Sequence, residues 1–294
     1  MEKRIRKMKI LILGDPFKVD INSCNSVLRQ NHEFYMVPSN IGPPNICHLR
    51  DRLQKEDTKE TKEDNYLFNF IHSSKPDLVI IICEGCTERF INEIELPKGP
   101  KYVTWTTDSY RHTVRVNNPK VNLHLSSIPD ATLTKEDIFL PLFASRQNPI
   151  PLDFRNIELG IICRSYNLDD NWRENQIEKL KSIYGFYRGQ NLTQFEYNTM
   201  IRNFKFGLNL GIWRDGLPNF RSFELGMNGI MPVCDNTNES ILREQFDTHI
   251  LIFNDIYSVP DLIRNCNYDP EQMANWYCIK HSFISRMNKI LEMI

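Results

Sequence analysis

The run from Leu78 to Cys83 constrains the fold more than any other part of the chain, because it reads Leu-Val-Ile-Ile-Ile-Cys without a polar residue. A short run that is apolar at every position predicts a strand buried on both faces, which is typical of the centre of a parallel sheet. Parallel neighbours are joined by crossovers that usually contain a helix. This feature therefore predicts an α/β fold with a parallel sheet.

The strand-and-helix pattern occurs twice along the chain, on either side of a stretch from Ser145 to Pro151 that contains two prolines and no apolar pattern. Such a stretch is typical of a linker between domains. The chain of 294 residues is long enough for two domains. Strands are expected at Lys9–Leu13, Phe34–Val37, Leu78–Cys83, Lys101–Thr106 and Leu123–Ser126 before the linker, and at Ile157–Cys163, Phe206–Leu210, Ile230–Asp235 and Ile250–Phe253 after it.

We therefore predict two Rossmann-like domains, at residues 1–145 and 152–275, followed by a closing helix at 276–294. The first strand ends in Gly14-Asp15-Pro16, a glycine turn like those that open Rossmann-like domains, but the further glycines of a dinucleotide fingerprint are absent. The segment from Pro270 to Ile294 is expected to form a helix or helix pair that breaks near Cys278. It carries an apolar stripe formed by Trp276, Tyr277, Phe283, Ile284, Met287 and Ile290.

Composition limits the classes of function. The 36 basic and 37 acidic side chains nearly cancel, so no global field favours nucleic acid or a membrane surface. The longest apolar run is too short to span a bilayer, and the basic N-terminus is not followed by the apolar region of a signal peptide. The eight cysteines are scattered, and several lie in predicted strands, which indicates reduced thiols and a cytoplasmic location.

The stretch from Asn219 to Asp235 carries the clearest chemistry. Arg221 and Glu224 are three residues apart, so they share one face of a predicted helix. Gly229 is placed to end that helix, and the run from Ile230 to Asp235 then predicts a strand. A helix whose first turn offers free backbone N–H groups, a guanidinium and a carboxylate suits a nucleotide. The N–H groups and Arg221 would hold a diphosphate, and Glu224 would accept hydrogen bonds from two ribose hydroxyls.

This stretch resembles the donor-binding segment of GT-B glycosyltransferases, especially the CgeB-like group related to spore maturation proteins. The resemblance rests on Arg221-Ser222-Phe223-Glu224, on the strand Gly207-Leu208-Asn209 before it, on Leu140-Pro141 near the end of the first domain, and on the Asp108–His112 segment. It runs in register from about Lys101 to the C-terminus. It implies the GT-B architecture, two Rossmann-like domains facing across a cleft, with the last helix packing back on the first domain.

The resemblance also implies a hexosyltransferase-like activity, in which a sugar passes from a nucleotide diphosphate sugar to a hydroxyl acceptor on a glycan, protein or small molecule. The donor is a substrate, and no separate cofactor is expected. Donor contacts are expected from the second domain, at Arg164, Arg173, Arg221, Ser222, Phe223 and Glu224. No Asp-x-Asp motif is placed to hold a metal ion beside the diphosphate, so the reaction is expected to be metal-independent.

The acceptor side is expected on the first domain, where the acceptor hydroxyl must lose a proton to a base. Asp108 directly follows a predicted strand, Asp15 holds the matching place after the first strand, and His112 has the ordinary pKa best suited to neutral pH. Each has a structural alternative, since an aspartate after a strand is often a helix cap. The sequence leaves open which of these three residues is the base, or whether no side chain acts as one.

Two alternatives to this function stay open. Phage enzymes that glycosylate modified DNA bases carry a similar Arg-x-x-Glu, so nucleic acid could be the acceptor, although the near-zero net charge speaks against it. Alternatively, the fold binds a nucleotide sugar without turnover. Many GT-B enzymes have a second glutamate eight residues before the Glu224 equivalent, and this chain has Gly216 there. That departure also weakens any assignment of a retaining mechanism.

Overall fold

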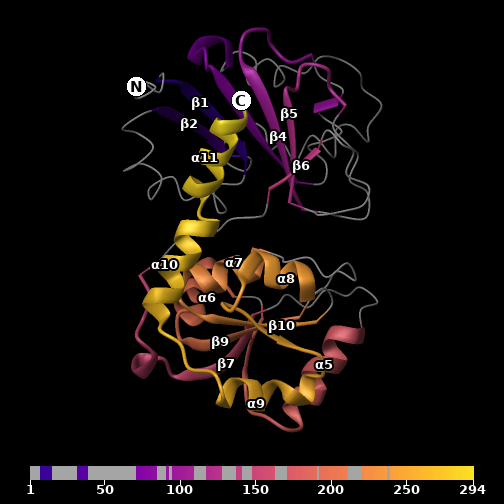
Figure 1. Ribbon diagram of the computed structural model, residues 1–294, viewed down its shortest axis with the longest axis vertical. Helices are drawn as coiled ribbons and strands as arrows, with labels where there is room; N and C mark the ends of the chain where they lie inside the picture. Colours follow the sequence, from indigo (N-terminus) through magenta and orange to yellow (C-terminus); the bar gives the residue numbers. More distant parts are fainter. Residues whose placement is uncertain are drawn as a thin grey trace. The chain divides into compact units, whose positions relative to one another are not determined.

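The structure is a computed structural model. It describes residues 7–14, 32–38, 71–84, 91–92, 95–108, 117–127, 137–140, 148–162, 171–190, 192–210, 220–236 and 239–294. The chain divides into two compact units, the first formed by Met1–Pro141 with Arg286–Ile294 and the second by Leu142–Ser285. Each unit contains one parallel sheet with helices around it (Figure 1), so the predicted α/β fold with two Rossmann-like sheets is confirmed.

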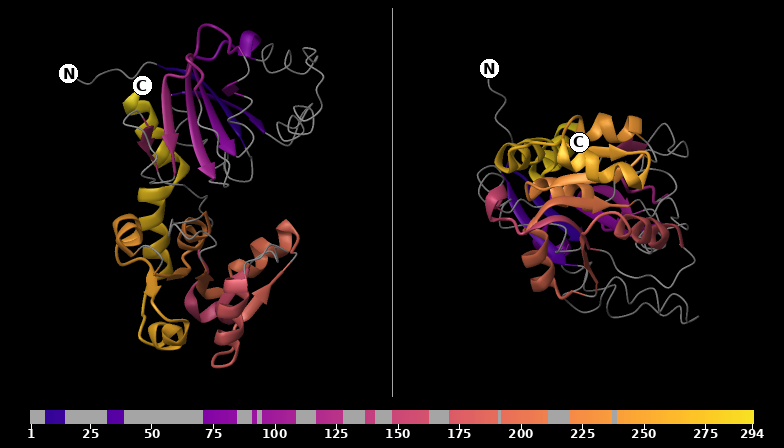
Figure 2. Two further views of the ribbon diagram at one scale, coloured as in Figure 1. Left: turned by 90° about the vertical axis from the view of Figure 1, so that its right-hand side faces the viewer. Right: turned by 90° about the horizontal axis from the view of Figure 1, so that it is seen from below.

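The first unit is built on a parallel sheet of six strands in the order β2-β1-β3-β4-β5-β6, whose neighbouring strands run side by side in Figure 2. The bounds are β1 Lys9–Gly14, β2 Glu33–Pro38, β3 Leu78–Glu84, β4 Lys101–Asp108, β5 Leu123–Ser126 and β6 Asp137–Phe139. As the apolar run predicted, β3 lies between two parallel partners, β1 and β4. Its residues Leu78, Val79 and Ile80 have no exposed surface, because both faces of the strand are covered.

The second unit has a parallel sheet of five strands in the order β11-β10-β9-β7-β8. The strands are β7 Ile157–Ile162, β8 Tyr187–Gly189, β9 Phe204–Asn209, β10 Met231–Asp235 and β11 Leu251–Phe253. The helices are α5 Asn171–Lys181, α6 Gln194–Ile201, α7 Phe220–Met227, α8 Glu239–Phe246, α9 Val259–Arg264, α10 Pro270–His281 and α11 Phe283–Met293, with short 3-10 helices at Leu152–Phe154 and Ile256–Ser258.

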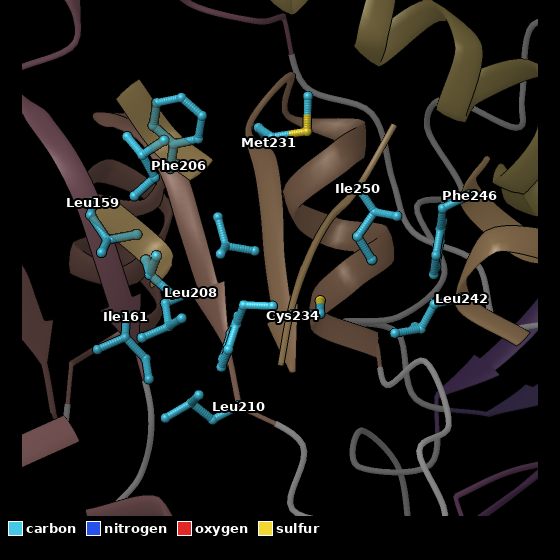
Figure 3. Packing of buried hydrophobic residues seen from close by; sticks show 14 of the residues in the cluster. Leu159, Ile161, Phe206, Leu208, Leu210, Met231, Cys234, Leu242, Phe246 and Ile250 are labelled. Carbon is cyan, nitrogen blue, oxygen red and sulfur yellow. The ribbon is translucent and has the colours of Figure 1, made fainter. Parts of the chain in front are cut away.

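Helices cover both faces of this second sheet. In Figure 1, α6 and α7 lie on one face and α5 and α9 on the other. Aliphatic side chains of β7, β9 and β10 form the centre of a buried cluster (Figure 3), in which Leu159, Leu208 and Val233 are at most 2% exposed. Phe223 and Met227 of α7 belong to the same cluster, so burial of these two side chains fixes α7 against the sheet.

The strand order of the second sheet reverses between β7 and β9, because β7 pairs with β8 on one side and with β9 on the other. In open parallel sheets, ligands bind beside the carboxyl ends of the strands at such a reversal. Helix α7 follows β9 and precedes β10, and these two strands are parallel, so the first turn of α7 lies at the carboxyl edge of the sheet. The topology thus places the Arg221–Glu224 turn where a ligand site is expected.

The end of α7 follows the sequence prediction. Gly229 has φ +64°, a left-handed conformation that costs little only for glycine. The amide of Ile230 then donates to Leu225 O at 3.0 Å, and the chain enters β10. The helix–turn–strand predicted for this stretch is therefore confirmed. A side chain at Gly229 would also meet the backbone oxygen of Pro270 at 2.4 Å, so glycine is required here on two counts.

Two features differ from the sequence prediction. Two short edge strands, β6 at Asp137–Phe139 and β8 at Tyr187–Gly189, were not predicted, because a strand of three residues has no long apolar run. The closing segment does form a helix pair, but α10 continues to His281 and α11 begins at Phe283, so the break lies at Ser282 and not near Cys278. The extended backbone of Ser282 separates the two helices.

The closing segment is shared between the two units: residues 276–285 belong to the second unit and Arg286–Ile294 to the first. Within the first unit, the Lys101 ammonium donates to the backbone oxygen of Ile294. The predicted domain limits at 145, 152 and 275, and a closing helix that packs on the first domain in solution, stay predictions. In the part of the chain that the structure describes, no helix is long and apolar enough to cross a membrane.

Candidate functional site

The candidate site is centred on the first turn of α7. Arg221 and Glu224 form the ion pair that their spacing predicted, with Arg221 NH1 and Glu224 Oε2 at 2.6 Å. The carboxylate side chain is 17% exposed and the guanidinium side chain 28%, so the pair is largely withdrawn from water but still reachable by a ligand. Partial burial makes such a pair stronger than one on an open surface.

Tyr197 of α6 contacts both members of this pair. Its hydroxyl donates to Glu224 Oε2, the same oxygen that accepts from Arg221. The guanidinium carbon of Arg221 lies 4.8 Å from the centre of the Tyr197 ring, within the range of a cation–π contact. Two helices that are separate in sequence thus meet at one carboxylate oxygen.

The electrostatics of Glu224 are set by two opposing effects. Burial raises the pKa of the Glu224 carboxyl, because desolvation disfavours the charged form, while the charge and hydrogen bond of Arg221 oppose this rise. The net direction is upward. Only the ionised form is purely an acceptor for ligand hydroxyls, and the Arg221 guanidinium favours that form.

Beneath the first turn, a small polar cluster ties α7 to the sheet. Asn209, the last residue of β9, donates through Nδ2 to Ser222 Oγ at 2.8 Å. The Cys234 thiol of β10 lies 3.7 Å from the same hydroxyl, and burial raises the pKa of this thiol to about 12. Cys234 is therefore a neutral packing residue. The cluster holds the first turn of α7 at a fixed distance from the carboxyl ends of β9 and β10.

Arg173 reaches the same edge from the opposite face of the sheet. It lies on α5, and its NH2 donates to Leu210 O at 3.4 Å, one residue beyond β9. The structure therefore brings Arg173 to the carboxyl end of the strand that also holds Ser222 through Asn209. Of the residues predicted for the donor site, Arg173, Arg221, Ser222 and Glu224 share this edge.

Ser222 and Phe223 are fully buried. The Phe223 ring packs against Phe246 and His281, with centroid distances of 5.0 and 5.2 Å. Their side chains hold the helix in place and are not available to a ligand. What these two residues offer a ligand is the backbone N–H groups of a helix first turn, which suit an anion.

Several predicted site residues lie outside the described part of the chain: Asp15, His112 and Arg164. For Asp108 the structure gives the backbone alone. It is the last residue of β4, in register with Glu84 of β3, so it stands at the carboxyl edge of the first sheet, as predicted. In the described ranges, no three His, Cys, Asp or Glu side chains gather as metal ligands would. Metal independence stays a prediction.

Sequence reasoning did not single out Tyr197 or Asn209 as site residues. Nothing in the sequence relates Tyr197 to a glutamate 27 positions later. Asn209 was noted only as part of a Gly-Leu-Asn strand. A polar residue at the end of an apolar parallel strand was the available signal, because such ends converge on the ligand-binding edge.

Just under half of the sequence matches a known family model. Residues 151–291 match the family described as "Glycosyl transferase-like". This range contains β7 to β11 and the candidate site, so this part of the chain is similar in sequence to glycosyl transferase-like domains. No curated protein sequence matches the chain.

Solved structures share the fold over nearly the whole chain. AviGT4, a glycosyltransferase involved in avilamycin A biosynthesis, is 11% identical with a TM-score of 0.57, covering 97% of this chain and 96% of its own. The sucrose-phosphate synthase of Thermosynechococcus elongatus is 7% identical with a TM-score of 0.53, covering 98% of each chain. A Listeria monocytogenes protein assigned as a UDP-N-acetylglucosamine 2-epimerase is 9% identical with a TM-score of 0.50, covering 97% and 95%. These likenesses show the fold, which is that of the GT-B glycosyltransferases.

Proposed function

We propose that this protein is a glycosyltransferase that moves a sugar from a nucleotide diphosphate sugar to a hydroxyl acceptor, without a metal ion. The observation that carries the proposal is the Arg221–Glu224 pair on the first turn of α7, at the carboxyl edge of a sheet whose sequence is glycosyl transferase-like. Membership of the CgeB-like group and hexosyl transfer belong to the proposal, as does a cytoplasmic location. The described thiols of Cys234, Cys266 and Cys278 are free, as a reducing compartment requires.

The site provides the two groups that a nucleotide diphosphate needs. Glu224 offers a carboxylate that can accept hydrogen bonds from vicinal ribose hydroxyls, and charge-assisted bonds of this kind are the strong ones. The helix N–H groups and the Arg221 guanidinium would meet the diphosphate. Arg221 already donates to Glu224 through NH1, and a guanidinium has five N–H donors, so it can serve a phosphate without leaving its partner.

In the transfer step, the bond between the anomeric carbon and the diphosphate oxygen breaks, and a bond from the acceptor oxygen forms. The leaving diphosphate gains negative charge, which fixed N–H donors and a guanidinium stabilise because they need no reorganisation. The acceptor hydroxyl loses its proton to a base, for which Asp108, Asp15 and His112 are the candidates. Arg164 and Arg173 would add positive charge on the diphosphate side.

The test is a thermal-shift screen of the whole chain against common nucleotide sugars, followed by product analysis with any donor that binds. A donor at a hundred times its Kd should add about 2.7 kcal/mol of stability. Product formation supports transfer. A donor that binds and is never turned over with any acceptor supports the sugar-binding alternative, and conversion of the donor sugar without an acceptor would indicate an epimerase.

A DNA acceptor is tested separately. Binding to duplex DNA that weakens steeply with salt would indicate phosphate contacts and support the phage-type alternative. Transfer to a non-nucleic hydroxyl acceptor, with no salt-dependent DNA binding, supports the function proposed here. No binding of any nucleotide sugar would contradict both.

A further inference from the structure

We infer that Tyr197 is a positioning residue of the donor site: its hydroxyl and ring hold Glu224 and Arg221 in the arrangement that a nucleotide meets. This inference rests on the proposed function, since it assigns a role within that site. It adds a third residue, from a different helix, to the Arg-x-x-Glu pair that the sequence singled out.

The geometry gives Tyr197 a contact with each charge. Its hydroxyl donates to Glu224 Oε2, and its ring face lies 4.8 Å from the guanidinium carbon of Arg221. Arg221 closes the triangle by donating to the same Oε2 at 2.6 Å. Each of the three side chains is thus held by the other two, so none can change rotamer without breaking two contacts.

Tyr197 is itself fixed by its own helix and by apolar packing. α6 begins with a capping box, in which Thr193 Oγ1 accepts from the Glu196 amide and the Glu196 carboxylate accepts from the Thr193 amide. The ring packs against the buried cluster of Ile201, Phe204, Leu225 and Ile230. Because Leu225 directly follows Glu224, this cluster holds the Tyr197 ring and the Glu224 carboxylate in fixed positions relative to each other. The ring would therefore keep its place if the hydroxyl were removed.

The triangle leaves one carboxylate oxygen for a ligand. Both hydrogen bonds end on Oε2, and none formed between described residues ends on Oε1. A carboxylate oxygen has two lone pairs, so Oε1 can accept from ribose hydroxyls while Oε2 stays bound to the protein. The hydroxyl of Tyr197 also favours the ionised form of Glu224, because it donates to the charged group. The groups that the described residues bring to Glu224 are Arg221 from α7 and Tyr197 from α6.

The experiment uses a double-mutant cycle on nucleotide affinity. Tyr197→Phe keeps the ring, its packing and the cation–π contact, and removes only the hydroxyl. Calorimetry with UDP, GDP, ADP, CDP and dTDP should show about tenfold weaker binding for Tyr197→Phe, the size of one hydrogen bond to a charged group. In a Glu224→Ala background the same change should have no effect, because Tyr197 acts through Glu224.

The matched control is Tyr184→Phe. Tyr184 also donates its hydroxyl to a carboxylate, Glu158 Oε2, in the second unit, but Glu158 lies in the first half of β7, away from its carboxyl end. Removing this hydroxyl should leave nucleotide affinity unchanged. A second reading comes from the pH profile: in Tyr197→Phe the loss of nucleotide binding on acidification should begin at a higher pH than in the wild type, and in Tyr184→Phe it should not move.

The outcomes separate this inference from the proposed function. If the wild type binds none of the five nucleotides, the proposed function falls, and this inference with it. If the wild type binds and Tyr197→Phe binds equally well with the same acid limb, only the role of Tyr197 is overturned. An equal loss for Tyr197→Phe in the presence and absence of Glu224 would likewise overturn it, since Tyr197 would then act directly on the ligand or on the fold. A ¹³C titration of the Glu224 carboxyl without ligand should show a higher pKa in Tyr197→Phe.

Discussion

The two sheets of this protein share a strand order and differ at their centres. In each sheet, the first strand along the chain lies between the second and the third, so the order reverses between β1 and β3 and again between β7 and β9. At the first reversal, large aliphatic residues stand in register, with Ile12 opposite Ile80. At the second, Gly160 stands opposite Gly207.

Neighbouring side chains occupy the space that the two glycines leave empty. A Cβ at Gly160 would lie 2.3 Å from Cζ of Phe204, and one at Gly207 would lie 2.3 Å from Cδ2 of Leu225. The second sheet therefore lets residues from β9 and α7 rest directly on its backbone. Since Leu225 follows Glu224, this close approach sets the distance between the candidate site and the sheet. Glycines at the centre of a parallel sheet thus let a covering helix pack directly against the strand backbone, which fixes the position of that helix.

The largest expected effect tests the division of roles between the two sheets, in which the first carries the acceptor base. Asp108→Asn should reduce turnover at saturating donor by about a hundredfold or more, the usual range for general base catalysis. Nucleotide affinity should hold, because a base acts only in the transition state. Steady-state kinetics of Asp108→Asn, Asp15→Asn and His112→Ala compare the three candidates. Near wild-type turnover of Asp108→Asn would make Asp108 a helix cap.

The second prediction tests whether the second sheet needs glycine at its centre for α7 to pack against it. Gly207→Ala should lower the free energy of unfolding by about 2–3 kcal/mol, because the added methyl group overlaps Leu225 and must push α7 outward. It should also weaken nucleotide binding, since Glu224 moves with Leu225. Urea denaturation and calorimetry measure the two effects.

The control for that variant is Val79→Ala in the first sheet, where Val79 is fully buried opposite Leu11. It should cost about 2 kcal/mol of stability, because it leaves a cavity, without changing nucleotide affinity. The comparison fails if the two variants lose affinity equally, or if Gly207→Ala is as stable as the wild type.

Most of the fold could be predicted from local sequence, and the candidate site only in part. Strands such as Leu78–Glu84 can be predicted because a strand that is buried on both faces requires an unbroken apolar run. The Arg221–Glu224 pair was predictable because both residues lie on one turn. Tyr197 was not, because its contact with Glu224 depends on how α6 and α7 pack, which no local pattern records. β8 was not predicted because an edge strand needs little apolar sequence.

The third prediction concerns the ligand carboxylate. Glu224→Ala should weaken nucleotide binding by about 2 kcal/mol, the size of lost hydrogen bonds to a charged group. Glu158→Ala is the matched control, because it removes another carboxylate that accepts from a tyrosine in the same unit. Its nucleotide affinity should be that of the wild type. Unchanged calorimetric affinity in a folded Glu224→Ala protein would remove the donor site from the first turn of α7.

The smallest expected effect is a pH dependence of stability that comes from Glu224. Burial raises the pKa of this carboxyl above its ordinary value of 4.5, so between 4.5 and the raised value the folded protein binds more protons than the unfolded chain. Stability rises with pH only where the unfolded state binds more protons, and here the reverse holds. The free energy of unfolding contributed by Glu224 should therefore fall as the pH rises through this window.

Glu224→Gln cannot titrate, so urea denaturation at closely spaced pH values should show the wild type losing stability relative to this variant as the pH rises. A difference that is constant with pH would mean that Arg221 fully offsets the desolvation of Glu224, and a difference of the opposite sign would mean that the ion pair outweighs it.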